Sequence, residues 1–146
     1  MGLRKVTDAP IIASVDVQGD GGLASGRGTW REAVEVMAEY GAAVAGFSTL
    51  ATPDQARGLA DAARETLEAR GADLCLMATL QVFQRDAKQQ GPTTENPYYS
   101  PDTMMPAALE LRAAGVQFLR AAGQATPAYT GVLAATVAGL DVAPVL

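Results

Sequence analysis

Residues 74–83 read Leu-Cys-Leu-Met-Ala-Thr-Leu-Gln-Val-Phe, and this stretch decides the fold that the sequence predicts. Its even-numbered positions are all apolar, whereas the odd-numbered positions are Cys75, Met77, Thr79, Gln81 and Phe83. Alternation with a period of two is typical of a β-strand, whose successive side chains point to opposite faces. We therefore predict a strand with one face toward a helical layer and the other toward something partly polar.

A helix is predicted directly before this strand, beginning after Thr52. Thr52 can cap the helix, Pro53 suits the first helical position, and Gln55 completes a capping box. Apolar residues then recur at spacings of three and four, at Ala56, Leu59, Ala60, Ala63 and Leu67. Gly71 ends the helix.

The rest of the chain extends this alternation of strands and helices. Strands are predicted at 11–17, 31–36, 40–50 and 126–137, a second helix over 100–122, and a short apolar segment at 141–146. The glycine-rich segment 18–28 and the polar segment 84–100 are predicted loops. This order is an α+β pattern with two helices on one face of a sheet. We expect one domain over residues 1–146, in which residues 1–27 form a leading strand and the glycine-rich loop.

The composition excludes several classes of function. The 146 residues include no histidine and one cysteine, Cys75, and the net charge is −5. Ser-His-Asp and Cys-His catalysis, histidine-ligated metals and an internal disulfide are therefore excluded, which fits a reducing cytoplasm. Lys and Arg form no patch, no apolar run approaches the roughly 20 residues that cross a bilayer, and residues 1–5 do not begin a signal peptide. We expect a cytoplasmic protein that binds neither nucleic acid nor membrane.

Three segments carry a resemblance to a known family. Residues 28–34 (Gly-Thr-Trp-Arg-Glu-Ala-Val) are similar to a Gly-Pro-Tyr-x-Gln-Ala-Val opening, residues 79–86 to a Thr-Val-Phe-x-x-Asp strand, and residues 127–132 to a Pro-Ala-Arg-Ser/Thr segment. Together they resemble the RidA/YjgF family of reactive intermediate deaminases. The resemblance implies a chorismate-mutase-like fold with a mixed sheet, a homotrimer with a pocket between subunits, and deamination of imines or enamines without a cofactor.

The same resemblance implies a site. Tyr129 stands where the family has the arginine that pairs with a substrate carboxylate. A phenol offers one neutral donor in place of two charged hydrogen bonds, which argues against the usual keto-acid-type substrate. Tyr129 is then the candidate catalytic residue. The candidate ligand-binding residues are Trp30, Phe47, Thr130, Tyr98 and Tyr99, and no metal ligands are expected.

Two functions remain open at this point. The first is a RidA-like enzyme that acts without a cofactor on a reactive imine or enamine, by water addition or proton transfer, in a pocket lacking the family arginine. The second is a non-catalytic trimeric module that binds a metabolite or a partner protein. Tyr129 and Trp30 also have a structural alternative, since both residues are suited to packing in the core. Cys75 is expected to be buried and inert.

Overall fold

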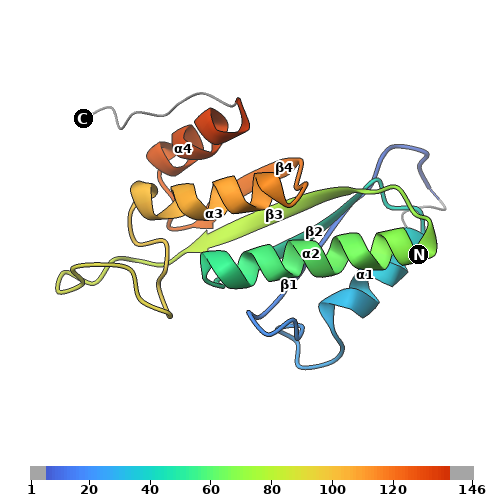
Figure 1. Cartoon of the computed structure of the whole chain (residues 1–146), viewed down its shortest axis with the longest axis horizontal. Helices are drawn as coiled ribbons and strands as arrows, with labels where there is room; N and C mark the ends of the chain where they lie inside the picture. The colour runs from blue at the N-terminus through green and yellow to red at the C-terminus, as the bar shows by residue number, and fades with distance from the viewer. Residues whose placement is uncertain (1–5, 139–146) are drawn as a thin grey trace.

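The computed structural model describes residues 6–138 and contains one sheet of four parallel strands. Strands and helices alternate along the chain, and the strands lie in the sheet in the order in which they occur in the sequence (Figure 1). The strands are β1 (Ile12–Asp16), β2 (Val44–Thr49), β3 (Cys75–Val82) and β4 (Phe118–Gly123). The helices are α1 (Trp30–Glu39), α2 (Pro53–Arg70), α3 (Pro101–Ala113) and α4 (Pro127–Val137).

The predicted α+β fold with a mixed, RidA-type sheet is therefore wrong. All three strand pairs are parallel, and a helix follows every strand, so the fold is α/β. Four helices, rather than two, accompany the sheet. Parallel neighbours need a crossover connection, and right-handed crossovers between successive strands place their helices on one face. The helices pack in the same order as the strands, α1 on α2, α2 on α3 and α3 on α4.

The face of β3 that meets these helices is the one that the alternation predicts. Leu76, Ala78, Leu80 and Val82 are buried in the main hydrophobic cluster. No helix of the described residues covers the opposite face of the sheet, and along β1 the side chains of that face are exposed. Among the described residues, this open face carries Ile12, Ser14, Asp16, Val44, Gly46, Ser48, Cys75, Met77, Thr79, Gln81, Phe118, Arg120 and Ala122.

The first error in the predicted elements concerns residues 31–36, which belong to α1 rather than to a strand. Thr29 begins the helix with a capping box, in which its Oγ1 accepts from the amide of Glu32 and its own amide donates to Glu32 Oε2. Trp30, Val34 and Met37 follow at helical spacing and are buried. The predicted strand at 40–50 shortens accordingly to β2.

The second error exchanges a helix and a strand near the carboxyl end. The helix predicted over 100–122 stops at Ala113, because Gly115 takes a φ of +90° and turns the chain into β4. The strand predicted at 126–137 is α4, which begins with Pro127 at its first position. The predicted segment 141–146 and the start of the chain at 1–5 lie outside the described residues.

The ends of the strands are staggered across the sheet. The hydrogen-bond register leads from Asp16 to Ser48, then to Thr79 and Arg120. The last strand nevertheless ends at Gly123, three residues beyond Arg120 and three strands away from β1. Relative to this row, β1 to β4 end zero, one, three and three residues further on, an average of one residue per strand. The same average over eight strands gives the shear of eight that closes a β/α barrel. The strand order, the row of helices and the stagger are those of half such a barrel.

Candidate functional site

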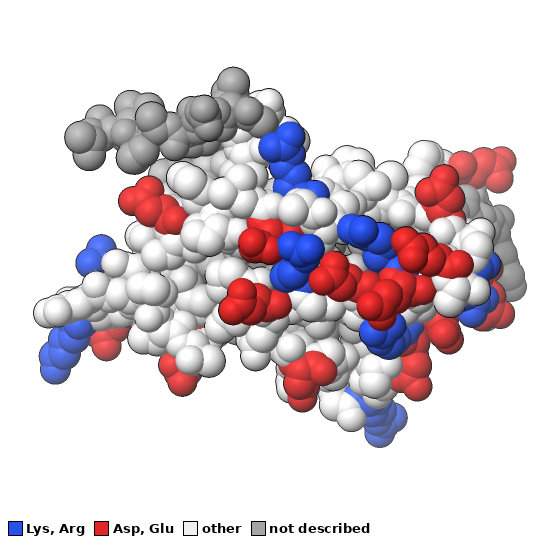
Figure 2. All heavy atoms as spheres, viewed as in Figure 1, with Lys and Arg blue, Asp and Glu red and all other residues white. Residues whose placement is uncertain are grey.

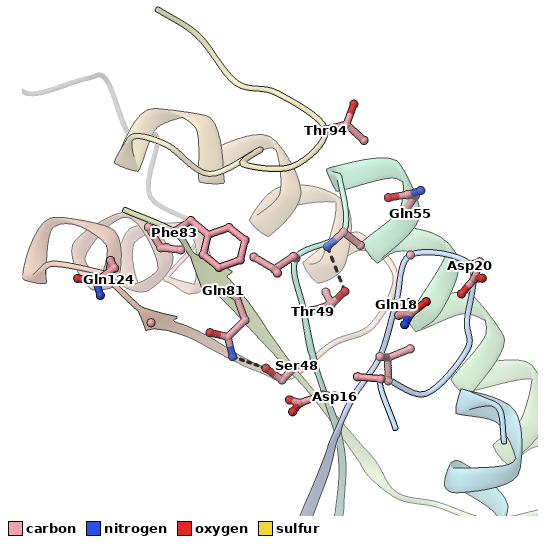
Figure 3. A pocket seen from close by; sticks show the side chains of 17 residues that line it. Asp16, Gln18, Asp20, Ser48, Thr49, Gln55, Gln81, Phe83, Thr94 and Gln124 are labelled. Atoms are coloured by element: carbon pink, nitrogen blue, oxygen red, sulfur yellow. Dashed lines mark hydrogen bonds between the residues drawn. The ribbon is translucent and has the colours of Figure 1, made fainter. Parts of the chain in front are cut away.

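A cavity of about 770 Å³ lies at the carboxyl edge of the sheet (Figure 3). Its walls come from the ends of all four strands and from the loops that follow them, together with Gln55 at the start of α2. In parallel α/β sheets and β/α barrels, ligands bind at this edge because the loops there converge on a common space. The position and size of the cavity are those of a small-molecule site.

Most of the polar groups that line this cavity are uncharged. Four are amides and three are hydroxyls, namely Gln18, Gln55, Gln81, Gln124, Ser48, Thr49 and Thr94. Asp16 and Asp20 are the acidic residues of the lining, and none of the described residues that line the cavity is a Lys or an Arg. Val17, Leu50 and Phe83 add apolar surface. The lining therefore suits a ligand that exchanges hydrogen bonds and carries no negative charge.

The strand ends hold several of these groups in fixed positions. Gln81 Nε2 donates to Ser48 Oγ at 2.5 Å, which links β3 to β2 across the floor of the cavity (Figure 3). Thr49 Oγ1 accepts from the amide of Ala51 at 3.0 Å and shapes the turn after β2. Ser48 and Thr49 are only 8 % and 3 % exposed. Ser48 keeps its own proton to donate, and Gln81 keeps its carbonyl oxygen to accept.

The two carboxylates differ in their surroundings. Asp20 Oδ1 accepts from the amide of Gly22 at 2.9 Å and so stabilises the glycine-rich loop. The Asp16 carboxylate has no hydrogen-bond or ion-pair partner among residues 6–138 and stands at the end of β1 on the open face. Asp16 is therefore the acid that is free to act on a ligand.

The glycine-rich loop predicted at 18–28 closes one side of the cavity. The amide of Ala24 donates to the carbonyl of Asp16 at 2.9 Å, which folds the loop back onto β1. Gly19 packs against Gln55, and a Cβ atom at position 19 would lie 2.5 Å from Gln55 Oε1. A larger residue at position 19 would therefore require the Gln55 side chain to move.

None of the six candidate site residues chosen from the sequence lines this cavity. Trp30 and Phe47 pack edge to face with ring centroids 5.4 Å apart, and Trp30 Nε1 donates to the carbonyl of Leu59 at 2.9 Å. Thr130 lines a separate hollow between β4 and α4. Tyr99 lies in the loop after β3, with the Arg85 guanidinium 5.2 Å from its ring centroid. The binding roles of these four residues remain predictions.

Tyr98 and Tyr129 are brought together behind the cavity wall. The Tyr129 hydroxyl donates to the carbonyl of Tyr98 at 2.9 Å, and the Tyr98 hydroxyl donates to the carbonyl of Ala51 at 2.6 Å. Burial raises the pKa of both hydroxyls, although Arg85 lowers that of Tyr129 in part. Both hydroxyls are thus protonated donors used inside the protein, and the catalytic role of Tyr129 remains a prediction.

Most of the cavity residues that were not predicted from the sequence lie in the last residues of a strand or in the loop that follows it. Asp16, Ser48 and Gln124 come at or just after strand ends, and carboxyl ends of parallel strands meet at one edge. This convergence of polar residues can be predicted from the sequence only when β2 and β4 are placed correctly and are known to be parallel.

Two further properties concern the described residues 6–138. No group of three or more His, Cys, Asp or Glu side chains in this range could hold a metal ion. None of the helices in the range has the length and apolar character needed to cross a bilayer.

Comparisons with known proteins bear on the fold. No protein-family model matches the sequence. No curated protein matches it either. A solved structure from Burkholderia cenocepacia J2315, described as that of "a putative phosphonomutase", superposes with a TM-score of 0.58 at 22 % identity over 89 % of this chain. The match covers 51 % of the Burkholderia protein, so this chain spans about half its length.

A second solved structure is less similar. The methanol:cobalamin methyltransferase complex MtaBC from Methanosarcina barkeri gives a TM-score of 0.46 at 10 % identity, over 78 % of this chain and 28 % of that one. A score this low supports no conclusion.

The comparisons also correct the family assignment made from the sequence. The Burkholderia structure is described as a phosphonomutase and not as a RidA/YjgF protein, and the four parallel strands are incompatible with that family's mixed sheet. The imine deaminase function, the trimeric binding module, the RidA-type homotrimer and its pocket between subunits therefore have no support. In fold, the chain is similar to about half of the Burkholderia protein.

Proposed function

We propose that the chain binds a small, uncharged polar molecule in the carboxyl-edge cavity and that Asp16 exchanges a proton with it. The observation that carries the proposal is the convergence of all four strand ends on one cavity of about 770 Å³. Amide side chains both donate and accept, so they match the hydroxyl and amide groups of a neutral ligand. Val17 and Phe83 supply the apolar contact that such sites usually provide.

Asp16 is the candidate catalytic residue of this proposal. A carboxylate serves as a general base when it reaches the proton that it removes and is not already committed to another donor. Asp16 meets the second condition among the described residues, whereas Asp20 is used by its own loop. Ser48 and Gln81 lie on neighbouring strands and would orient the ligand beside it.

Action on a phosphonate is not proposed. A phosphonate carries negative charge, and proteins bind such groups with Arg, Lys, a metal ion or converging backbone amides. The part of the cavity lining that the structure describes has two carboxylates and no cationic side chain. Likeness of fold alone does not transfer an activity, because function resides in the site.

The proposal includes a cytoplasmic location, one domain and no cofactor. The chain has a single cysteine, which suits a compartment where thiols stay reduced. Its length is that of one ordinary domain.

The test is a ligand screen by thermal shift with the wild-type chain. The probes are neutral polyols and nucleosides, small amines, and methylphosphonate with and without Mg²⁺. We expect stabilisation by a neutral probe, since a ligand at one hundred times its Kd adds about 2.7 kcal/mol to the free energy of unfolding. Stabilisation by methylphosphonate alone would contradict the proposal.

Two pairs of variants then locate the binding site. Gln81→Leu removes a cavity amide and should weaken binding by about 5- to 30-fold, the equivalent of one lost buried hydrogen bond. Gln90→Leu is the control, because Gln90 is exposed and lines none of the cavities described here. Asp16→Asn should abolish turnover of a ligand that is converted, whereas Asp73→Asn, at an exposed position outside these cavities, should not.

A further inference from the structure

The two outer strands of the sheet, β1 and β4, each pair on one side only. β1 pairs with β2 and β4 pairs with β3 among the described residues, so an edge of the sheet is open at each end. The glycine-rich loop reaches the β1 edge only at its carboxyl end, where the amide of Ala24 bonds to the carbonyl of Asp16. Open edges of this kind readily pair with another strand. Since β1 and β4 run in the same direction, each offers a parallel edge.

The exposed apolar side chains gather at these same two ends of the fold. Within the part of the chain that the structure describes, eight large hydrophobic side chains are exposed, and five of them belong to the first or last strand, the first or last helix, or the cap of α1. These five are Ile12, Val36, Tyr40, Phe118 and Val137. An apolar surface that recurs at both ends of a fold indicates a contact that the isolated chain lacks.

The last helix shows the same property along its whole length. The sequence of α4, from Pro127 to Val137, contains no charged residue, yet Thr130, Ala134 and Val137 are exposed. In contrast, charged side chains crowd the surface over α2 (Figure 2). A helix without a charged face is normally covered. The exposed side of α4 therefore needs a partner.

We propose that a second copy of the chain closes the sheet into an eight-stranded barrel about a two-fold axis. β4 of each copy then pairs in parallel with β1 of the other, and α4 of each packs against α1 of the other. The stagger of about one residue per strand, continued over eight strands, gives the shear of eight that such barrels have. A two-fold axis along the barrel makes both junctions identical, so one kind of contact closes both open edges.

The length of the Burkholderia protein supports a second copy as the partner, since the match spans 51 % of that protein. The four described strands of each copy make eight in a pair, which is the number that the complete barrel needs. The inference goes beyond the proposed function and does not depend on any ligand. It also predicts that the two carboxyl-edge cavities share one mouth, with an Asp16 from each copy.

The test is the mass of the full chain in solution, measured by light scattering with size-exclusion chromatography. We expect twice the 15.1 kDa of one chain at micromolar concentration. Val137→Glu on α4 should weaken dimerisation by about thirtyfold or more, since it places an unpaired charge in the contact. Ile12→Lys should do the same from the opposite edge.

The matched control is Leu109→Glu on α3. Leu109 and Val137 are both 50 % exposed, but α3 lies inside the row of helices and takes no part in the proposed contact. The control variant should remain a dimer. Circular dichroism of all variants separates dissociation from unfolding, and Ile12→Lys supports the inference if Val137→Glu fails to fold. The proposed dimer would be overturned by a monomeric wild-type chain or by a dimer that persists in both edge variants. Equal dissociation of the control variant would also overturn it.

Discussion

Two tyrosine hydroxyls connect α4 to the wall of the cavity. Tyr129 bonds to the backbone of Tyr98, and Tyr98 bonds in turn to the carbonyl of Ala51, which lines the cavity. Tyr98 is fully buried, so its hydroxyl cannot turn to water instead. The turn after β2 therefore depends on side chains that are distant in the sequence.

Replacing Tyr98 by Phe tests this connection. The change leaves the Ala51 carbonyl without its partner, and we expect a loss of about 1–3 kcal/mol in the free energy of unfolding. Urea unfolding at pH 7 measures the loss. Tyr40→Phe is the control, because Tyr40 is 46 % exposed and should show almost no change.

The same tyrosine predicts how stability depends on pH. Burial raises the pKa of the Tyr98 hydroxyl above its ordinary value of 10, so the folded chain holds this proton more tightly than the unfolded chain. The stabilisation that follows from this raised pKa is fully present below pH 10 and is lost as the pH rises above 10. Urea unfolding between pH 9 and 11 should show that the free energy of unfolding falls less with pH in Tyr98→Phe than in the wild type. If the free energy of unfolding fell equally with pH in both proteins, Tyr98 would not be the source of the pH dependence.

Gly123 sets the geometry at the end of β4. It has a φ of +73°, and a Cβ atom there would lie 2.5 Å from the carbonyl oxygen of Val82. We expect Gly123→Ala to lower the free energy of unfolding by at least about 1–2 kcal/mol, the cost of the left-handed conformation alone. Gly58→Ala in α2 meets no atom within 4 Å and should instead stabilise the chain by about 0.5–1 kcal/mol. Thermal unfolding of both variants measures the two changes in stability, which should have opposite signs.

At the scale of elements, the sequence predicts α2 and β3 well because their signals are local. The capping box at Thr52 and the alternation from Leu74 to Phe83 each lie within a few residues. Residues 30–39 instead contain valines, and residues 127–137 contain valines and threonines. These β-branched residues suit either a helix or a strand, and tertiary packing decides between the two. Placing α1 and α4 wrongly turned a regular α/β alternation into an α+β pattern.

The same errors in placing the elements explain why the candidate site was not predicted from the sequence. Its polar residues lie at the carboxyl ends of strands, so their convergence is visible only when every strand is placed and known to be parallel. Trp30, Phe47 and Tyr129 were predicted to line a site because of their positions in the RidA/YjgF resemblance, and Tyr98 because it lies in the loop after the alternating strand. Their size is used in the core, where the indole and hydroxyl groups find backbone partners.

The beginning of α2 offers a prediction at this scale. Thr52 and Gln55 form the capping box, and Gln55 also lines the cavity. Thr52→Ala should lower the free energy of unfolding by about 0.5–2 kcal/mol. Thr126→Ala, at the cap of α4, should cost less, because the Thr126 side chain makes no capping hydrogen bond. Chemical unfolding of both variants measures the difference, and equal losses would count against the role of the box.

For the whole molecule, the proposed two-fold barrel makes stability depend on concentration. When folding and association are coupled, each tenfold rise in protein concentration adds about 1.4 kcal/mol to the apparent free energy of unfolding. The thermal midpoint of the wild type should therefore rise between 1 and 100 μM, whereas that of Ile12→Lys should stay constant. A concentration-independent wild-type midpoint would contradict the dimer.

The strand order has a consequence for the motions of the sheet. Every strand pairs with its neighbour in the sequence, so the fold consists of successive βαβ units, with β2 and β3 flanked on both sides and β1 and β4 on one. All six residues of β2 are buried. Backbone amides in β2 and β3 should thus exchange with deuterium only through global unfolding, while those of β1 and β4 exchange first through local opening. In a dimer closed at both edges, the protection of β1 and β4 would rise to that of the inner strands.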